Sequence, residues 1–377
     1  MAVLTTAELK LWVYGGNILN VPTIPNYTLK KTKLSTENII AFEIAELIKD
    51  YIEIKFNGDY NTIEQSKWVK WTVIRTYHDA TTDTYSTDTY SQNAIAFRGY
   101  GKNTDGINPE LSKDLLISNT VIHNKCGDSL AVPFYIADGV GVAKVQYFQD
   151  TSEIINSPLL GTANIFTVAQ ELRVNPPLDD IITIDKTASL TAGSDDSIST
   201  NVVPYNATEI QYTTHDGIVK TIPIECIEEC GEPHHKVSFI NKFGVMQDMW
   251  FFAKKTESMS SERKGYKRTS LSTLDSVSYD VSAHQNVYLE NQGKEKFTMN
   301  TGFIHESYNE VIRQLLVSEY VYMHDRYKSN PVSGQGSLAI PIKIVSDNLD
   351  IKTRLHDKLI NYELEFEADS DFIQSVR

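Results

Sequence analysis

Apolar and polar residues alternate in short runs along most of the chain, and this period of two predicts β-strands. Ile52–Phe56 alternates and ends at Asn57-Gly58, and Trp68–Tyr77 alternates again after it. Near the end of the chain, Leu359–Glu367 places aromatic and leucine side chains on one face and glutamates on the other. We therefore predict a mainly β fold with a few helices (α+β).

Two stretches instead carry apolar residues at helical spacing. The first predicts a helix over residues 36–52, with Ser35 or Thr36 as its N-cap. The second predicts a helix over residues 306–317, and its apolar positions are Tyr308, Val311, Ile312, Leu315 and Leu316. Strands are predicted after each helix, so both ends of the chain have the same order of elements. An internal structural duplication is a hypothesis, because the two regions share no convincing sequence identity.

The length of 377 residues is enough for two or three domains, each with its own core. Residues 1–150 are predicted to form an N-terminal β-rich domain that contains the first helix. Regular turn signals between short alternating runs predict a small antiparallel β-sandwich over residues 151–225. Residues 226–377 are predicted to form a C-terminal β-rich domain that contains the second helix.

The most aromatic part of the chain is predicted to be a β-hairpin. Lys236–Ile240 and Val245–Ala253 read as its strands, and Asn241–Gly244 supplies the turn. The aromatic side chains either fill a core or form an interface with another subunit, and the candidates for the interface are Phe243, Trp250 and Phe251.

Residues 79–91 are rich in Thr, Asp and Tyr and poor in aliphatic residues, which predicts a loop or an exposed hairpin tip. Its tyrosines Tyr85 and Tyr90 are candidates for contact with a neighbouring subunit. An alternative hypothesis makes the chain a receptor-recognition or carbohydrate-binding module, in which Trp68, Trp71, Tyr85 and Tyr90 stack on sugars.

The chain is acidic, with 35 Lys and Arg against 49 Asp and Glu and a net charge of −14. This charge repels phosphate backbones and argues against nucleic-acid binding. Residues 254–272 form the only basic, Ser-rich tract, and its cations could meet an acidic neighbour. Residues 1–10 lack the pattern of a signal peptide, and no apolar run approaches the length of a membrane span, so we expect no membrane anchor.

Three cysteines are too few for a disulfide framework in a chain of this length, so we expect a reducing compartment. Two of them belong to a cluster whose residue types suit zinc, namely Cys226, Cys230, His234 and His235. The spacing is unlike that of structural zinc sites, because the Cys pair and the His pair lie too close together in sequence. We therefore predict no metal and no cofactor, and interpret the cluster as a strand end with incidental thiols.

No catalytic motif is complete. Gly139-Val140-Gly141 lacks the third glycine and the following helix of a dinucleotide loop, and His305-Glu306 lacks the second histidine of a metalloprotease because residue 309 is Asn. A Gly-x-Ser-x-Gly elbow and a phosphate loop are both missing. The prediction is a protein without enzymatic activity. The alternative left open is a catalytic Ser, His and Asp that are brought together only by folding.

One stretch resembles virion structural proteins of tailed bacteriophages. It contains Glu229-Cys230 and then Lys236–Phe252, with the run Phe239-Ile240-Asn241-Lys242-Phe243-Gly244 at its centre. Phe42–Tyr51 and Asn361–Glu367 are similar to segments of the same proteins. The resemblance therefore touches most of the chain, but it does not indicate which component of the virion this is.

The resemblance implies a protein that forms a homo-oligomeric ring at the neck, tail or baseplate and contacts other virion proteins there. It also implies β-sandwich or barrel domains with one helix each, as in tail tubes, at both ends of the chain. No catalytic residue is carried over. The expected location is the virion, after assembly in the cytoplasm of the host bacterium.

Overall fold

The computed structural model of this chain describes residues 2–15, 19–36, 39–58, 66–106, 115–126, 128, 130–137, 142–149, 152–156, 179–185, 207–214, 217, 219–228, 231, 233–268, 271–272, 278–279, 281–282, 284–329, 337–346, 350 and 359–370. The predicted mainly β fold is confirmed: these residues form several sheets, most of them antiparallel, and two α-helices.

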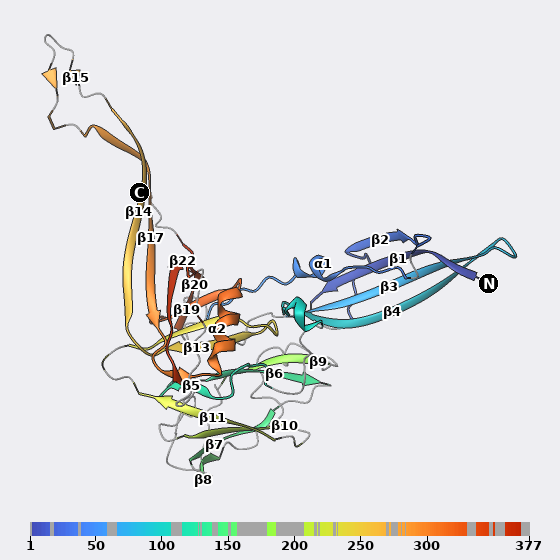
Figure 1. The fold of residues 1–377 in the computed structure, drawn as a ribbon, viewed down its shortest axis with the longest axis horizontal. Coiled ribbons are helices and arrows are strands. Elements are labelled where there is room, and N and C mark those ends of the chain that lie inside the picture. Colours follow the sequence, from blue (N-terminus) through green and yellow to red (C-terminus); the bar gives the residue numbers. More distant parts are fainter. Residues whose placement is uncertain are drawn as a thin grey trace.

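The N-terminal strands form a four-stranded antiparallel sheet that extends away from the rest of the molecule (Figure 1). Its order is β2-β1-β3-β4, and its strands are β1 (Ala2–Tyr14), β2 (Tyr27–Thr32), β3 (Ser66–Asp79) and β4 (Thr84–Phe97). β3 and β4 are the two arms of one long hairpin, paired from Ser66↔Phe97 to Asp79↔Thr84. A short 3-10 helix, η1 (Asn103–Asp105), follows β4.

The first helix is much shorter than predicted. Helix α1 spans only Ala45–Lys49, and residues 39–44 before it are not helical. Its N-cap, Ile44, offers no side-chain hydrogen bond, and three isoleucines in residues 39–44 favour extended backbone over helix. The predicted helix over residues 36–52 is therefore wrong in length, although Ile48 does face the core.

Ile52–Phe56, predicted as a strand, is not part of any strand or helix. Its alternation still has a physical meaning, because Ile52, Ile54 and Phe56 are buried while the residues between them are exposed. The Ile54 carbonyl accepts a hydrogen bond from the Tyr322 hydroxyl at 3.2 Å. The segment therefore packs between the N-terminal sheet and the C-terminal part of the chain.

The central part of the chain contributes a five-stranded sheet of order β5-β11-β10-β7-β8 and a separate pair, β6 and β9. The bounds are β5 (Ile122–Lys125), β6 (Ala131–Ala137), β7 (Val142–Gln149), β8 (Ser152–Asn156), β9 (Asp179–Asp185), β10 (Glu209–Thr214) and β11 (Val219–Ile227). Most of the sandwich predicted over 151–225, and the glycine motif at 139–141, lie outside the described residues. The pairing of β5 with β11 joins sequence on both sides of residue 150, and the predicted domain division stays a prediction.

The C-terminal region forms a seven-stranded sheet of order β13-β12-β19-β20-β22-β17-β14. Its strands are β12 (His235–Ile240), β13 (Met246–Phe251), β14 (Lys255–Lys267), β17 (Asn286–Asn300), β19 (Val321–Ser329), β20 (Ser337–Ile344) and β22 (Glu363–Ala368). Two short ladders complete the region: β15 (Leu271–Ser272) with β16 (Ser278–Tyr279), and β18 (Ile304–His305) with β21 (Leu359–Ile360). The outer parts of β14 and β17 leave the body as a two-stranded ribbon (Figure 1).

The second predicted helix is confirmed as α2 (Tyr308–Val317), two residues shorter at its start. Its predicted apolar positions face the core of the seven-stranded sheet, with Val311, Ile312 and Leu315 fully buried. They pack against aromatic residues from β12, β13, β17 and β22, among them Phe239, Phe251, Phe297 and Phe366. This is the largest of the hydrophobic clusters that the described residues form.

The predicted hairpin around residues 241–244 is confirmed as β12–β13. Its turn packs against the backbone that follows β4. Gly244 has a φ of +79°, and a Cβ placed on it would lie 2.6 Å from the backbone nitrogen of Gly99. Only glycine therefore fits both the left-handed conformation and the close approach. The Tyr100 amide, just beyond, donates to the Lys242 carbonyl at 2.8 Å.

Candidate functional site

A cavity of about 700 Å³ lies where the N-terminal sheet meets the C-terminal part of the chain. Three segments and Ile240 of β12 line it: the segments are residues 42–52 around α1, residues 96–100 at the end of β4, and residues 317–320 between α2 and β19. Most of the lining is hydrophobic. We call this region the joint, because it lies between the N-terminal sheet and the C-terminal part of the chain.

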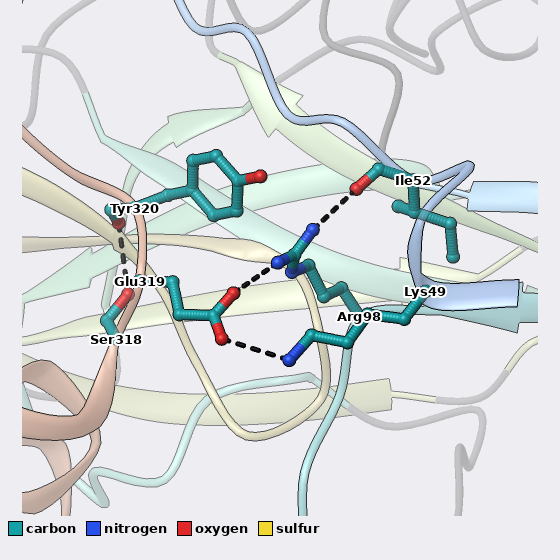
Figure 2. Close-up of polar contacts among 6 residues, drawn as sticks. All are labelled: Lys49, Ile52, Arg98, Ser318, Glu319 and Tyr320. Carbon is teal, nitrogen blue, oxygen red and sulfur yellow. Dashed lines mark hydrogen bonds and ion pairs between the residues drawn. The ribbon is translucent and has the colours of Figure 1, made fainter. Parts of the chain in front are cut away.

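The charged residues of the joint form one connected network (Figure 2). Glu319 pairs with Lys49, whose Nζ lies 3.0 Å from Oε1, and with the guanidinium of Arg98 through Oε2. Arg98 also donates to the Ile52 carbonyl at 2.9 Å and lies 4.8 Å from the ring centre of Tyr320. The network thus connects α1, β4 and the segment before β19.

The network at the joint is suited to holding the two parts together and poorly suited to catalysis. The hydrogen bond from Lys49, followed by that from Arg98, lowers the pKa of Glu319, so this carboxylate stays ionised and paired at neutral pH. A general acid needs a raised pKa, and a nucleophile needs an adjacent base. The charged network provides neither.

The structure does bring a serine, a histidine and an aspartate together, but in an order that does not activate the serine. Ser238 donates to Asp248 Oδ1 at 2.5 Å, and its oxygen lies 2.7 Å from His324 Nε2. In a catalytic triad the histidine lies between the other two and takes the serine proton. Here the serine lies in the middle and its proton points to the aspartate.

Burial also argues against a hydrolase at this position. Ser238 has no exposed surface and His324 is nearly as buried. Burial, and then the charge of Lys236, lower the pKa of His324 well below its usual value, so the ring is neutral at pH 7. We interpret the group as a buried polar cluster that fixes β12, β13 and β19 to one another.

A second buried histidine, His123, connects β5 to the start of α2. Its backbone amide donates to the Tyr308 hydroxyl at 2.8 Å, and its Nε2 accepts from the His305 amide at 3.0 Å. Burial, and then the charge of His305, lower the pKa of His123 to about 4. The contacts are therefore those of a neutral structural histidine.

One member of the candidate zinc cluster is not available to bind a metal ion. The sulfur of Cys226 is bonded to Cys126 in a disulfide whose Cα atoms lie 5.0 Å apart, and Cys230 lies outside the described residues. His234 packs edge-on against Phe252. Within the part of the chain that the structure describes, no group of three or more His, Cys, Asp or Glu residues is placed to hold a metal ion.

The disulfide also corrects the expectation that the cysteines stay reduced. β5 and β11 are parallel neighbours, and the Cys126 amide donates to the Ile227 carbonyl at 3.0 Å. Sequence gave no sign of this, because the two cysteines are 100 residues apart.

Two of the predicted interface aromatics belong to the chain's own core. Phe251 is 0% exposed and Trp250 is 4% exposed, and the Trp250 indole donates to the Asn124 side chain at 2.9 Å. Phe243 is partly buried against a small cluster that contains Leu116 and Val245. The core interpretation of this hairpin is therefore the correct one for Trp250 and Phe251.

The predicted tyrosines of the β3–β4 hairpin are on the surface, with Tyr85 69% and Tyr90 49% exposed. The second of the two predicted alternatives, an exposed hairpin tip, is the correct one: residues 80–83 form the turn, and residues 84–93 of β4 continue from it as an exposed edge strand. Trp68 is buried and cannot stack on a ligand, which removes one member of the proposed sugar platform.

Sequence reasoning missed the second exposed element, the β14–β17 ribbon. Residues 254–272 are described from sequence only as a basic, Ser-rich tract whose cations could meet an acidic neighbour. The signal for β17 is short: it pairs with β14 along its length, but only Lys296–Asn300 alternates polar and apolar residues, whereas residues 290–296 are polar or glycine.

The comparisons with known proteins give no family: neither a family model, nor a curated protein, nor a solved structure matches the chain. In the described residues no helix is both long and apolar enough to cross a membrane.

Proposed function

We propose that the chain is a non-enzymatic structural component of a tailed-bacteriophage virion. It assembles as a ring in the tail, baseplate or neck, through contacts between the sheets and loops of neighbouring subunits and with other virion proteins. It needs no cofactor, and its location is the virion. The resemblance of residues 236–252 to such proteins motivates the virion assignment.

The observation that supports assembly most strongly is the β14–β17 ribbon. β22 pairs with β17 only from Lys296 to Asn300, so beyond this point the described residues of the ribbon have no third strand. A two-stranded ribbon is marginally stable alone in water, and three or more strands or a packed face are needed for stability. A ribbon of this length is therefore expected to acquire a partner.

The ribbon also exposes apolar side chains that a monomer would leave in water. Met259, Tyr266, Tyr288 and Leu289 are at least half exposed, and Leu289 is 75% exposed. Contiguous exposed apolar surface commonly marks sites of protein association. The buried polar groups around Ser238 and His123, by contrast, make their contacts within the chain.

The experiment that tests this proposal is the native mass of the purified chain, measured by light scattering over a wide concentration series, with negative-stain images of the same fractions. A defined oligomer with ring-shaped particles is the expected result. A monomer at every concentration would contradict the proposal. Tyr85→Ser tests the surface of the β3–β4 hairpin, because it removes an exposed side chain and leaves every core contact in place.

A further inference from the structure

The five-stranded sheet meets the C-terminal part of the chain at its edge strand, β5. The other four strands, β11, β10, β7 and β8, follow β5 in the sheet and lie at the bottom of Figure 1. The ladder between β5 and β11 is parallel and contains four residue pairs, from Ile122↔Ile224 to Lys125↔Ile227. Parallel pairing is slightly less stable per residue than antiparallel pairing. We therefore expect the sheet to separate first between β5 and β11.

Strand β5 is held on the C-terminal part by contacts that involve no cysteine. The Trp250 indole donates to the Asn124 side chain at 2.9 Å. The His123 amide donates to the Tyr308 hydroxyl at 2.8 Å, and His123 Nε2 accepts from the His305 amide at 3.0 Å. His123 and Asn124 are both buried. We therefore expect β5 to stay in place when its ladder with β11 opens.

The disulfide reinforces this ladder. The Cys126 sulfur is bonded to that of Cys226, and the Cys126 amide donates to the Ile227 carbonyl at 3.0 Å. Ile227 also packs against the largest hydrophobic cluster. His123 Nδ1 lies 3.3 Å from Glu225 Oε2, but burial lowers the pKa of His123 to about 4, so the two do not form an ion pair at neutral pH. Of these contacts, the disulfide is the one that a change in redox conditions breaks.

The two cysteines differ in exposure. Cys126 is 6% exposed, whereas Cys226 is partly exposed. The rate of thiol–disulfide exchange depends on access to the sulfur that reacts. A small thiol or disulfide in solution therefore reaches Cys226 first, and Cys126 supplies the second sulfur.

We propose that the Cys126–Cys226 bond is a redox-controlled clasp that holds β11, β10, β7 and β8 against β5. When both cysteines are thiols, the β5–β11 ladder opens and the four strands move as one unit, because antiparallel ladders join them to one another. Opening leaves an unpaired edge on β5 and on β11, and such edges accept strands from other chains. The clasp is independent of the proposed assembly function.

The clasp closes by thiol–disulfide exchange with a small disulfide such as oxidised glutathione, which is the oxidant. The Cys226 thiolate attacks one sulfur of the small disulfide, forms a mixed disulfide and releases one glutathione thiolate. The Cys126 thiolate then attacks the Cys226 sulfur, forms the protein disulfide and releases the second glutathione thiolate. The two cysteines lose two electrons and two protons, and the small disulfide takes them up and becomes two thiols. Reduced glutathione reverses these steps.

The test is amide hydrogen exchange of the full chain, oxidised and after reduction with dithiothreitol. The Cys126 amide is the direct reporter, because it is bonded to Ile227 across the ladder. Amides of the buried helix α2 are the reference for unfolding of the whole chain. Reduction should accelerate exchange at Cys126 by at least about tenfold more than in α2, because the ladder then opens while the core stays folded.

Cysteine variants provide the controls. Cys126→Ser/Cys226→Ser should give the fast exchange of the ladder under oxidising and reducing conditions alike. Cys230→Ser keeps the bond and should behave as the wild type does. In this Cys230→Ser background, Cys126→Ser should gain one glutathione in intact mass when oxidised glutathione is added, and Cys226→Ser should gain it more slowly because Cys126 is buried.

Selective acceleration at Cys126 that oxidised glutathione reverses is the expected result. Equal acceleration at Cys126 and in α2 would overturn the proposal, since the bond would then act on the stability of the whole chain alone. A bond that stays oxidised in the folded protein at every glutathione ratio would also overturn it. So would loss of the circular dichroism signal on reduction, because the bond would then maintain the fold rather than one ladder.

Discussion

The close contact between the hairpin turn and the end of β4 can be tested with two glycines that share one conformation. Gly244 and Gly106 have φ values of +79° and +71°, so alanine at either position adopts a left-handed conformation. That conformation costs about 1–2 kcal/mol for a residue with a Cβ. The two positions differ in their surroundings: at Gly106 nothing lies within 4 Å of the added Cβ, whereas at Gly244 three backbone atoms lie within 2.8 Å.

Gly244→Ala should therefore destabilise the chain more than Gly106→Ala does. The atoms in the way belong to the backbone of Arg98 and Gly99, which cannot rotate aside as a side chain can. Overpacking of this kind costs about 1–3 kcal/mol, in addition to the conformational cost that both variants share. We expect a loss of about 2–5 kcal/mol for Gly244→Ala and of about 1–2 kcal/mol for Gly106→Ala.

The assay is urea unfolding followed by circular dichroism and by tryptophan fluorescence, because Trp68 and Trp250 are both buried. Hydrogen exchange of the Tyr100 amide reports the contact directly, since this amide donates to Lys242 across the same turn. Equal losses of stability in the two variants, with unchanged exchange at Tyr100, would refute the close approach as the cause.

Two further predictions concern the joint and the disulfide. Because the pKa of Glu319 is lowered, its contribution to stability is fully present above the ordinary glutamate pKa of about 4.3 and is lost as pH falls through the lower folded value. Glu319→Gln should remove this acid-side dependence in pH-dependent urea unfolding, at a cost of at most about 1 kcal/mol at pH 7 because the side chain is half exposed; an acid profile identical to that of the wild type would contradict the assignment. Reduction of Cys126–Cys226 should lower the free energy of unfolding by about 2–4 kcal/mol, because the bridge closes a loop of 100 residues in the unfolded chain. Urea unfolding with and without dithiothreitol measures the change, Cys126→Ser/Cys226→Ser should match the reduced protein, and superimposable curves in the two conditions would show that the bridge has no such effect.

The elements that could be predicted are those whose buried and exposed positions follow from the spacing of their own apolar residues. Helix α2 is an example: its apolar stripe packs on one sheet, and the spacing of Val311, Ile312 and Leu315 was enough to find it. The β12–β13 hairpin is another, since Asn241 and Gly244 carry the turn. The alternation at Ile52–Phe56 identified the buried side chains correctly but could not show that this segment has no strand beside it.

The features that could not be predicted from the sequence depend on contacts between distant parts of the chain. Cys126 meets Cys226 because β5 and β11 pair in parallel, and Glu319 meets Arg98 across 221 residues. Ser238, Asp248 and His324 come from three strands, so only their geometry decides that the serine is not activated. The burial of Trp250 and Phe251 likewise depends on which elements cover β13.

Strand β17 belongs to the ribbon and to the core at once. Its 15 residues span about 50 Å, and at its inner end Phe297 and Met299 are buried between β14 and β22. A pulling force along the ribbon would therefore act on the hydrogen bonds to β22 in shear, all of them together, rather than opening them one after another. The inner end of the ribbon is thus anchored in the hydrophobic core that contains Phe297 and Met299, and tension on the ribbon would be transmitted to that core.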